Sequence, residues 1–246
     1  MSDELNSSEP RTLAAIDLGS NSFHMIIARL RDGHFQVVDR LREMVQLRAG
    51  LDQDGRLTDE AQDRAIACLQ RFGERINGLS NDSVRLVGTN TLRVAKNSRS
   101  FLRKAKKALG HPIEIIAGEE EARLIYLGVA HALAFDNSRR LVMDIGGGST
   151  EFIIGEGFSG LKRESLEMGC VSFSQRFFDD GKINKSRMKA AIIAAGSRLR
   201  DIQRPYRKMG WSEAIGASGT IRCVAGIVKE NNWSDDGVIT PNPWIS

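Results

Sequence analysis

Two copies of one short loop carry the residues of this chain that are best suited to bind phosphate. Residues 16–22 read Ile-Asp-Leu-Gly-Ser-Asn-Ser, and residues 143–149 read Met-Asp-Ile-Gly-Gly-Gly-Ser. Each copy follows a short apolar run that is typical of a buried strand. A glycine just past a strand permits a tight turn, and small residues leave backbone N–H groups exposed to an anion. The repeat predicts two phosphate loops with the ligands Ser20, Asn21, Ser22, Gly146, Gly147, Gly148 and Ser149.

Acidic side chains accompany both loops. Asp17 and Asp144 lie at the predicted strand ends, and Glu151 follows the second loop. A carboxylate beside bound phosphate typically holds Mg²⁺, because a hard cation prefers oxygen ligands. We expect Asp144 and Glu151 to share Mg²⁺, with Asp17 reaching it from the other side. The alternatives are an ordinary strand-ending turn for either loop alone and an exposed strand position for Glu151.

Three further segments hold candidate site residues. Arg93 follows a predicted strand, and its guanidinium suits bidentate phosphate binding, with a salt bridge to a local acid as the alternative. Glu121 lies at the start of a predicted helix, where a carboxylate either deprotonates water or merely favours the first helical turn. Ser218 and Gly219 lead into another predicted helix, whose N-terminus would attract an anion or a nucleotide.

Two better-known phosphate-binding patterns do not fit the chain. It contains no Gly-x-x-x-x-Gly-Lys-Ser/Thr sequence, which excludes a P-loop. The second loop also lacks the third glycine of the dinucleotide-binding fingerprint. The two loops therefore indicate another class of phosphate-binding fold.

The composition indicates a soluble globular protein with an anionic partner. Of the 246 residues, 41% are hydrophobic and 27% are charged, and the net charge is +4. The basic run 99–107 forms either a binding face or a solvated face of a helix, and without interleaved aromatic residues it does not favour nucleic-acid binding. No apolar run is long enough for a membrane span. Three separated cysteines without metal-binding spacing favour a cytoplasmic location.

The order of predicted elements indicates an α/β protein with two domains. Strands are expected at residues 13–16, 23–30, 35–41, 84–87, 113–116, 141–143, 151–154, 161–167 and 214–215, and helices at 58–76, 98–110, 119–133, 186–202 and 221–229. Each half begins with three strands and continues with alternating helices and strands, which predicts two domains flanking a cleft. We assign residues 1–11 to a disordered lead-in, 12–125 to the first domain and 126–246 to the second.

The second domain is expected to be incomplete at its C-terminus. It lacks counterparts of the helices that close the first half, and the chain after Trp233 is irregular in pattern. A sheet without those helices would expose an apolar face, which marks an interaction site or an aggregation liability. We therefore expect a homodimer formed through this surface, or poor solubility.

Six motifs resemble those of the exopolyphosphatase and guanosine-pentaphosphate phosphatase family. They are residues 15–23, 89–97, 118–123, 144–151, 168–171 and 216–220. The resemblance extends from about Leu13 to about Thr240. It departs from the family at the C-terminus, because shorter members complete the second domain and longer members add helical domains.

The resemblance implies two ribonuclease H-like domains of the actin, Hsp70 and sugar kinase superfamily that flank a cleft, with the second domain truncated. It implies that Glu121, immediately before the alanine of its motif, activates water. Mg²⁺ would be the cofactor, with Mn²⁺ as a substitute, and the reaction would be hydrolysis of the terminal phosphoanhydride of inorganic polyphosphate or guanosine pentaphosphate. The alternatives are an ATP-dependent small-molecule kinase of the same superfamily and a non-catalytic module that binds polyphosphate or a nucleotide.

Overall fold

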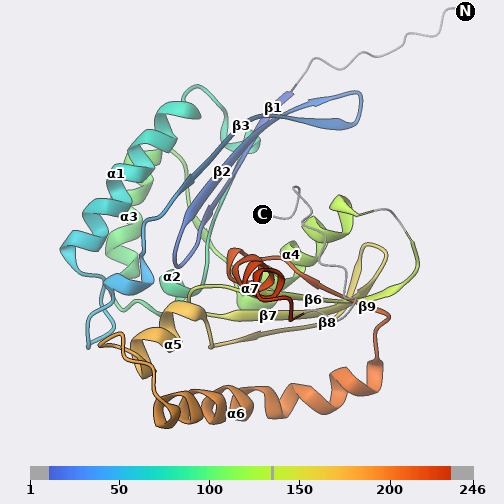
Figure 1. The fold of residues 1–246 in the computed structure, drawn as a ribbon. Coiled ribbons are helices and arrows are strands. Elements are labelled where there is room, and N and C mark those ends of the chain that lie inside the picture. The colour runs from blue at the N-terminus through green and yellow to red at the C-terminus, as the bar shows by residue number, and fades with distance from the viewer. Residues whose placement is uncertain (1–10, 134–135, 234–246) are drawn as a thin grey trace, which may run out of the picture. The chain divides into compact units, whose positions relative to one another are not determined.

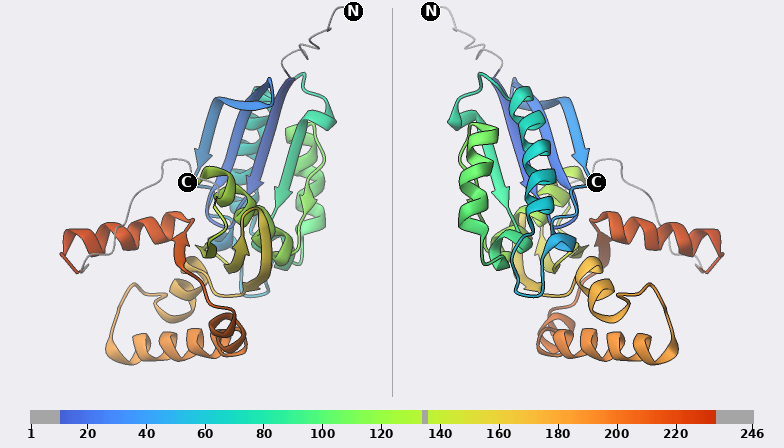
Figure 2. Two further views of the ribbon diagram at one scale, coloured as in Figure 1. Left: turned by 90° about the vertical axis from the view of Figure 1, so that its right-hand side faces the viewer. Right: turned by 90° about the vertical axis from the view of Figure 1, so that its left-hand side faces the viewer.

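The computed structural model describes residues 11–133 and 136–233 (Figures 1 and 2). They belong to two compact units that divide between Ile116 and Ala117. The expected division at 125/126 falls inside helix α4 (Gly118–Ala132), whose apolar residues pack on the sheet of the second unit. The expected lead-in lies outside the described residues except for Arg11, which begins the first strand.

The first unit is a five-stranded mixed sheet with two helices on one face (Figure 1). Its strand order is β3-β2-β1-β4-β5, with β1 antiparallel to β2 and parallel to β4. The elements are β1 (Arg11–Leu18), β2 (Phe23–Arg31), β3 (His34–Glu43), α1 (Asp59–Arg75), β4 (Val84–Gly88), α2 (Asn90–Val94), α3 (Ser98–Leu109) and β5 (Glu114–Ile115), with short 3₁₀ turns at Arg48–Gly50 and Asn81–Ser83. The strands and helices predicted for this half are confirmed, and the short helix α2 is an addition.

Local signals set the turns and helix ends of this unit. Asp32 and Gly33 have φ values of 51° and 77°, as the two-residue hairpin between β2 and β3 requires. Helix α1 begins after Thr58, whose side chain accepts a hydrogen bond from the N–H group of Ala61. Helix α3 ends at Gly110, which has the left-handed conformation of a C-terminal cap.

The two faces of the first sheet differ in what covers them. Ile16 and Leu18 of β1 are buried in a core that also contains Phe72 of α1 and Phe101 of α3. The opposite face forms a hollow of about 630 Å³, and its apolar lining includes Leu13, Ala15, Ile26, Ala28, Phe35 and Val37. Phe35 is 68% exposed there. The sequence predicted an open apolar face on the second sheet, and the structure instead has one on the first.

The second unit repeats the order of the first four strands of the first unit. Its four-stranded sheet has the order β8-β7-β6-β9, with β6 antiparallel to β7 and parallel to β9. The elements after α4 are β6 (Arg139–Ile145), β7 (Thr150–Glu156), β8 (Ser159–Leu166), α5 (Cys170–Phe177), α6 (Lys185–Met209), β9 (Glu213–Gly216) and α7 (Gly219–Glu230). The register shifts between Ile154 and Gly155 of β7, as it does at the corresponding point, Ile27 and Ala28, of β2.

Helices pack on both faces of the second sheet. Tyr126 of α4 belongs to one core with Val142 and Ile153, while Tyr206 of α6 belongs to another with Ile154. Because successive side chains of a strand point to opposite faces, Ile153 and Ile154 place the two helices on opposite sides. The prediction of an open apolar face on this sheet is therefore wrong.

Helix α6 extends seven residues beyond its predicted end at Ile202. Pro205, which lacks an N–H group and would usually end a helix, lies in this extension. The helix continues because Tyr206 is buried and its hydroxyl donates to the carbonyl of Phe152 at 2.8 Å. Packing on the sheet therefore stabilises a turn that local propensity disfavours.

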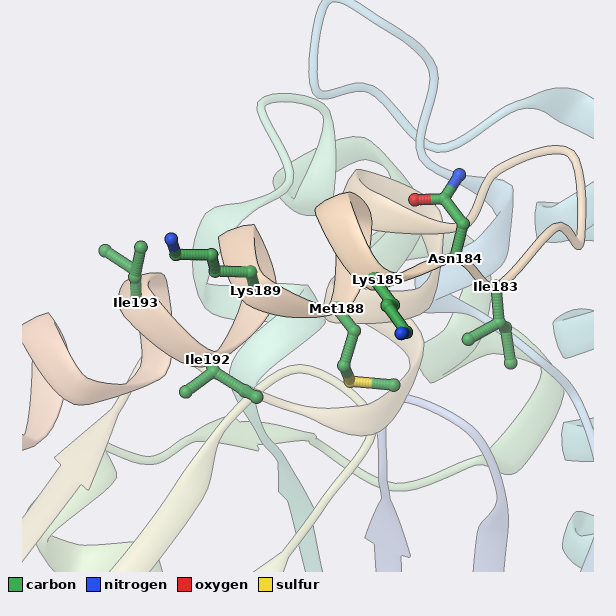
Figure 3. Close-up of a pocket in the computed structure, with 7 residues that line it drawn as sticks. All are labelled: Ile183, Asn184, Lys185, Met188, Lys189, Ile192 and Ile193. Carbon is green, nitrogen blue, oxygen red and sulfur yellow. The ribbon is translucent and has the colours of Figure 1, made fainter.

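The first half of α6 presents apolar side chains to solvent. Met188 and Ile192 project from the same side of the helix (Figure 3) and are 41% and 64% exposed. With Ile183, Ile193 and two lysines they line a hollow of about 700 Å³. No acidic or hydroxyl side chain is among its lining residues, so it offers no chemistry for phosphate hydrolysis.

Candidate functional site

The first loop is a tight turn fixed by glycine and by neighbouring backbone. A Cβ atom on Gly19 would lie 2.7 Å from the carbonyl oxygen of Ser22, which leaves no room for a side chain. The carbonyl of Ser20 accepts a hydrogen bond from the N–H group of Arg48 at 2.8 Å. The hydroxyl of Ser20 accepts one from the hydroxyl of Thr91 at 2.7 Å. Ser20 and Ser22 are each 6% exposed, so this loop is held rigidly.

Arg93 lies in helix α2, directly after strand β4. Its Nη1 atom donates to the carbonyl of Ile116 at 2.8 Å, within the same unit. This bond holds one side of the guanidinium beside Ile116, the residue that follows β5. The first unit thus contains Asp17, the three predicted loop ligands and Arg93.

The second loop is held by the first turn of α5. The N–H group of Cys170 donates to the carbonyl of Gly146 at 2.9 Å, and that of Val171 donates to the carbonyl of Gly147 at 3.0 Å. In a trans peptide the C=O and N–H groups point in opposite directions. The N–H groups of Gly147 and Gly148 therefore point away from α5, as the predicted binding of an anion requires.

Gly169 makes this arrangement sterically possible. A Cβ atom at this position would lie 2.5 Å from the carbonyl carbon of Gly147. The sequence placed Gly169 in a family motif but assigned it no role, and it did not predict α5. The hydroxyl of Ser172, which accepts from the N–H group of Gly169 at 3.0 Å, was an available helix-start signal.

Two carboxylates and a hydroxyl form a row across three strands of the second sheet. The register pairs Asp144 of β6 with Glu151 of β7, and Glu151 with Ser165 of β8. Side chains at paired positions lie on the same face, about 4.5–5.5 Å apart at Cβ. Glu151 is 1% exposed, and its Oε1 atom accepts a hydrogen bond from Ser165 at 2.7 Å. We name this set the carboxylate row; Ser165 was not predicted, because strand register cannot be read from spacing.

Glu121 joins the carboxylate row from the first turn of α4. Helix α4 packs on the same face of the sheet, since its Tyr126 contacts the core of Val142 and Ile153. Burial and the charge of Glu121 raise the pKa of Asp144 to about 6.

The pKa of Glu151 is raised by similar causes, and hydrogen bonds partly oppose this rise. Burial, followed by the negative charge of Glu121, raises the pKa of Glu151 to about 8. Hydrogen bonds with the hydroxyls of Ser149 and Ser165 act in the opposite direction. The cluster therefore keeps protons at a higher pH than exposed carboxyl groups would, because little water reaches it to stabilise their charged forms.

A divalent cation fits the chemistry of this cluster. A cation beside Asp144 and Glu151 would stabilise the charged forms that burial disfavours. Within residues 11–133 and 136–233, no three His, Cys, Asp or Glu side chains are grouped as a metal site. Mg²⁺ is commonly bound by one or two carboxylates together with water and substrate phosphate. The participation of Asp17 in the same site stays a prediction.

Ser218 ties the second loop to helix α7. Its hydroxyl oxygen accepts hydrogen bonds from the N–H groups of Ile145 at 3.1 Å and Ile221 at 3.3 Å. Gly219 is the first residue of α7. Ser218 therefore acts as a helix cap and as a brace for the strand end, while the binding of substrate by Ser218 and Gly219 stays a prediction.

Two α/β units, in which the third, second, first and fourth strands lie side by side in that order and a glycine-containing loop follows the first strand, define a protein with two ribonuclease H-like domains. Solved structures of similar fold support this class. A crystal structure of an exopolyphosphatase-like protein has a TM-score of 0.83 at 28% identity, covering 91% of this chain and 70% of that one. An exopolyphosphatase from Cytophaga hutchinsonii has a TM-score of 0.80 at 27% identity, covering 92% of this chain and 73% of that one.

Sequence comparison identifies the family. The model of the Ppx/GppA phosphatase family matches residues 26–243, and the chain belongs to this family. It is 48% identical over 230 residues to a putative exopolyphosphatase of Haemophilus influenzae, covering 94% of this chain and 71% of that protein.

A second group of relatives is longer. The chain is 48% identical over 227 residues to the guanosine-5'-triphosphate,3'-diphosphate pyrophosphatase of Vibrio vulnificus, covering 92% of this chain. It spans 45% of that protein's length.

In the described part of this chain, no helix combines the length and apolar character needed to cross a membrane.

Proposed function

We propose that the protein hydrolyses the terminal phosphoanhydride bond of inorganic polyphosphate or guanosine pentaphosphate and releases phosphate. The observation that carries this proposal is the grouping of Glu121 with Asp144 and Glu151 beside the second phosphate loop. Membership of a phosphatase family, and the names of the two relatives, support the same reaction class.

In this proposal the second unit supplies the base and the phosphate donors. Glu121 orients a water molecule and accepts its proton as the water oxygen attacks the terminal phosphorus. The bond from that phosphorus to the bridging oxygen breaks, and the shortened substrate leaves with the electron pair. The N–H groups of Gly147 and Gly148, with the hydroxyl of Ser149, bind the phosphoryl oxygens as their charge develops. Mg²⁺ or Mn²⁺, held by Asp144 and Glu151, would neutralise phosphate charge.

The first loop and Arg93 are proposed to bind phosphoryl groups as well. Ser20 and Ser22 offer hydroxyls, Asn21 offers an amide, and Arg93 offers a planar guanidinium that suits phosphate oxygens.

A cytoplasmic homodimer is part of the same proposal. Sedimentation of the purified chain at micromolar concentration would measure its oligomeric state, and a monomer would contradict the dimer.

Phosphate release with and without an acceptor tests the reaction class. The protein is incubated with Mg²⁺ and either long-chain polyphosphate or guanosine pentaphosphate, and free phosphate is measured for both substrates side by side. Release without an acceptor is expected. Turnover of ATP only in the presence of a hydroxyl-bearing acceptor would favour a kinase, and binding of polyphosphate without turnover would favour a non-catalytic module.

A further inference from the structure

The hydroxyl of Ser165 contacts a buried carboxylate that the sequence motifs single out. Its Oγ atom donates to Oε1 of Glu151 at 2.7 Å, a normal length for an O–H···O hydrogen bond. The two residues are paired in the register of β7 and β8, so the contact is set by the sheet rather than by a flexible loop. Ser165 itself is partly exposed, while Glu151 is 1% exposed.

The contact restricts how the Glu151 carboxylate can rotate. The last torsion of a glutamate side chain is broad and has little preference of its own. A hydrogen bond at Oε1, together with the hydrogen bond from Ser149, restrains the orientation of the carboxylate plane, and a carboxylate has further lone pairs that can bind a cation. In metal sites, groups that hydrogen-bond to a ligand in this way commonly raise metal affinity by about 10- to 100-fold.

We propose that Ser165 is a positioning residue that orients Glu151 for a divalent cation. The inference rests on the proposed function, because it assumes that Glu151 holds the cation. Ser165 makes no proposed contact with the substrate, and its effect passes through the carboxylate. Removing its hydroxyl should therefore weaken the binding of the cation and leave the chemical step nearly unchanged once the cation is saturating.

Substitution with two side chains of the same shape isolates the hydroxyl. S165T keeps a hydroxyl, S165V replaces it with a methyl group, and both β-branched residues suit a strand. S159A is the matched control, because Ser159 lies at the far end of β8 and is exposed. Mg²⁺ is titrated in two assays: phosphate release from polyphosphate, and the rise in melting temperature of the protein without substrate.

S165V is expected to need about 10- to 100-fold more Mg²⁺ than the wild type for half-maximal effect in both assays, with kcat at saturating Mg²⁺ within a few-fold. S165T and S159A should follow the wild-type curves. Equal Mg²⁺ requirements for S165V and S165T, in a wild type that responds to Mg²⁺, would overturn the role of Ser165 alone. If Mg²⁺ changes neither the melting temperature nor the phosphate release of the wild type, the proposed metal site is wrong, and so is the inference that rests on it.

Discussion

The two units place different side chains at the same positions of one sheet pattern. In the first unit the register pairs Asp17 with His24, and His24 with Arg42. In the second unit the corresponding row is Asp144, Glu151 and Ser165. The first row has one acid, an imidazole and a guanidinium, whereas the second has two acids and a hydroxyl, which suits a cation. The two units thus share a loop after the first strand and differ in the residue opposite the aspartate, which is histidine in the first unit and glutamate in the second.

The two loops are also braced in different ways. The first loop is held by the N–H groups of the segment after β3 and by the hydroxyl of Thr91. The second is held by the N-terminal turn of α5, whose N–H groups bind the loop carbonyls. The first loop therefore relies on backbone bonds and one side-chain bond, and the second on close backbone packing against a helix, so different substitutions should break them.

The largest expected effect concerns Glu121, the proposed base. It belongs to the second unit and has no proposed counterpart in the first. E121Q should lower kcat for polyphosphate hydrolysis by about 10²-fold or more, because glutamine cannot accept the proton from water. Polyphosphate binding should persist. E119Q is the matched control, since Glu119 lies in the same turn of α4 and is exposed. Turnover of E121Q close to that of E119Q would contradict the assignment.

The second prediction tests whether the cation is bound by the carboxylate row and not by the corresponding row of the first unit. Phosphate release should stop in excess chelator and return with Mg²⁺ or Mn²⁺. E151Q and D144A should each raise the Mg²⁺ concentration for half-maximal rate by at least about 10-fold, because each removes a negative ligand. H24Q, at the corresponding position of the first unit, should leave that concentration unchanged. An equal shift in H24Q and E151Q would remove the contrast between the two rows.

The third prediction concerns the packing behind the second loop. G169A should lower the free energy of unfolding by about 1–3 kcal/mol, because its Cβ atom would lie 2.5 Å from the backbone of Gly147. It should also weaken polyphosphate binding by moving the loop. G128A is the control, since a Cβ atom there meets nothing within 4 Å and alanine favours a helix. Urea denaturation measures both variants, and equal stabilities would show that the loop adapts.

The fourth prediction is a pH dependence of stability in the absence of divalent cations. Burial raises the folded-state pKa of Glu151 from 4.5 to about 8, so the folded protein retains a proton that the unfolded chain has lost. The free energy of unfolding should therefore fall as pH rises from about 4.5 to about 8. E151Q should show a shallower fall, and Mg²⁺ should flatten the wild-type curve. Parallel curves for wild type and E151Q in chelator would contradict this sign.

Short-range patterns predicted a large part of the molecule. The paired loops, the hairpin at Asp32 and Gly33, the start of α1 after Thr58 and the end of α3 at Gly110 depend on neighbouring residues. The repeated order of strands and helices likewise follows from hydrophobic periodicity. These features are visible in the sequence because the interactions that produce them span only a few residues.

Tertiary packing decided the rest. Helix α4 belongs to the second unit because Tyr126 packs with Val142 and Ile153, and α6 passes Pro205 because Tyr206 binds the sheet. The pairing of Glu151 with Ser165 depends on the register of two strands. Register is set by which faces are buried across the whole sheet, and a shift of one residue would turn every side chain to the other face. The sequence alone therefore determined which residues could bind phosphate and a cation, and the sheet decided which of them meet.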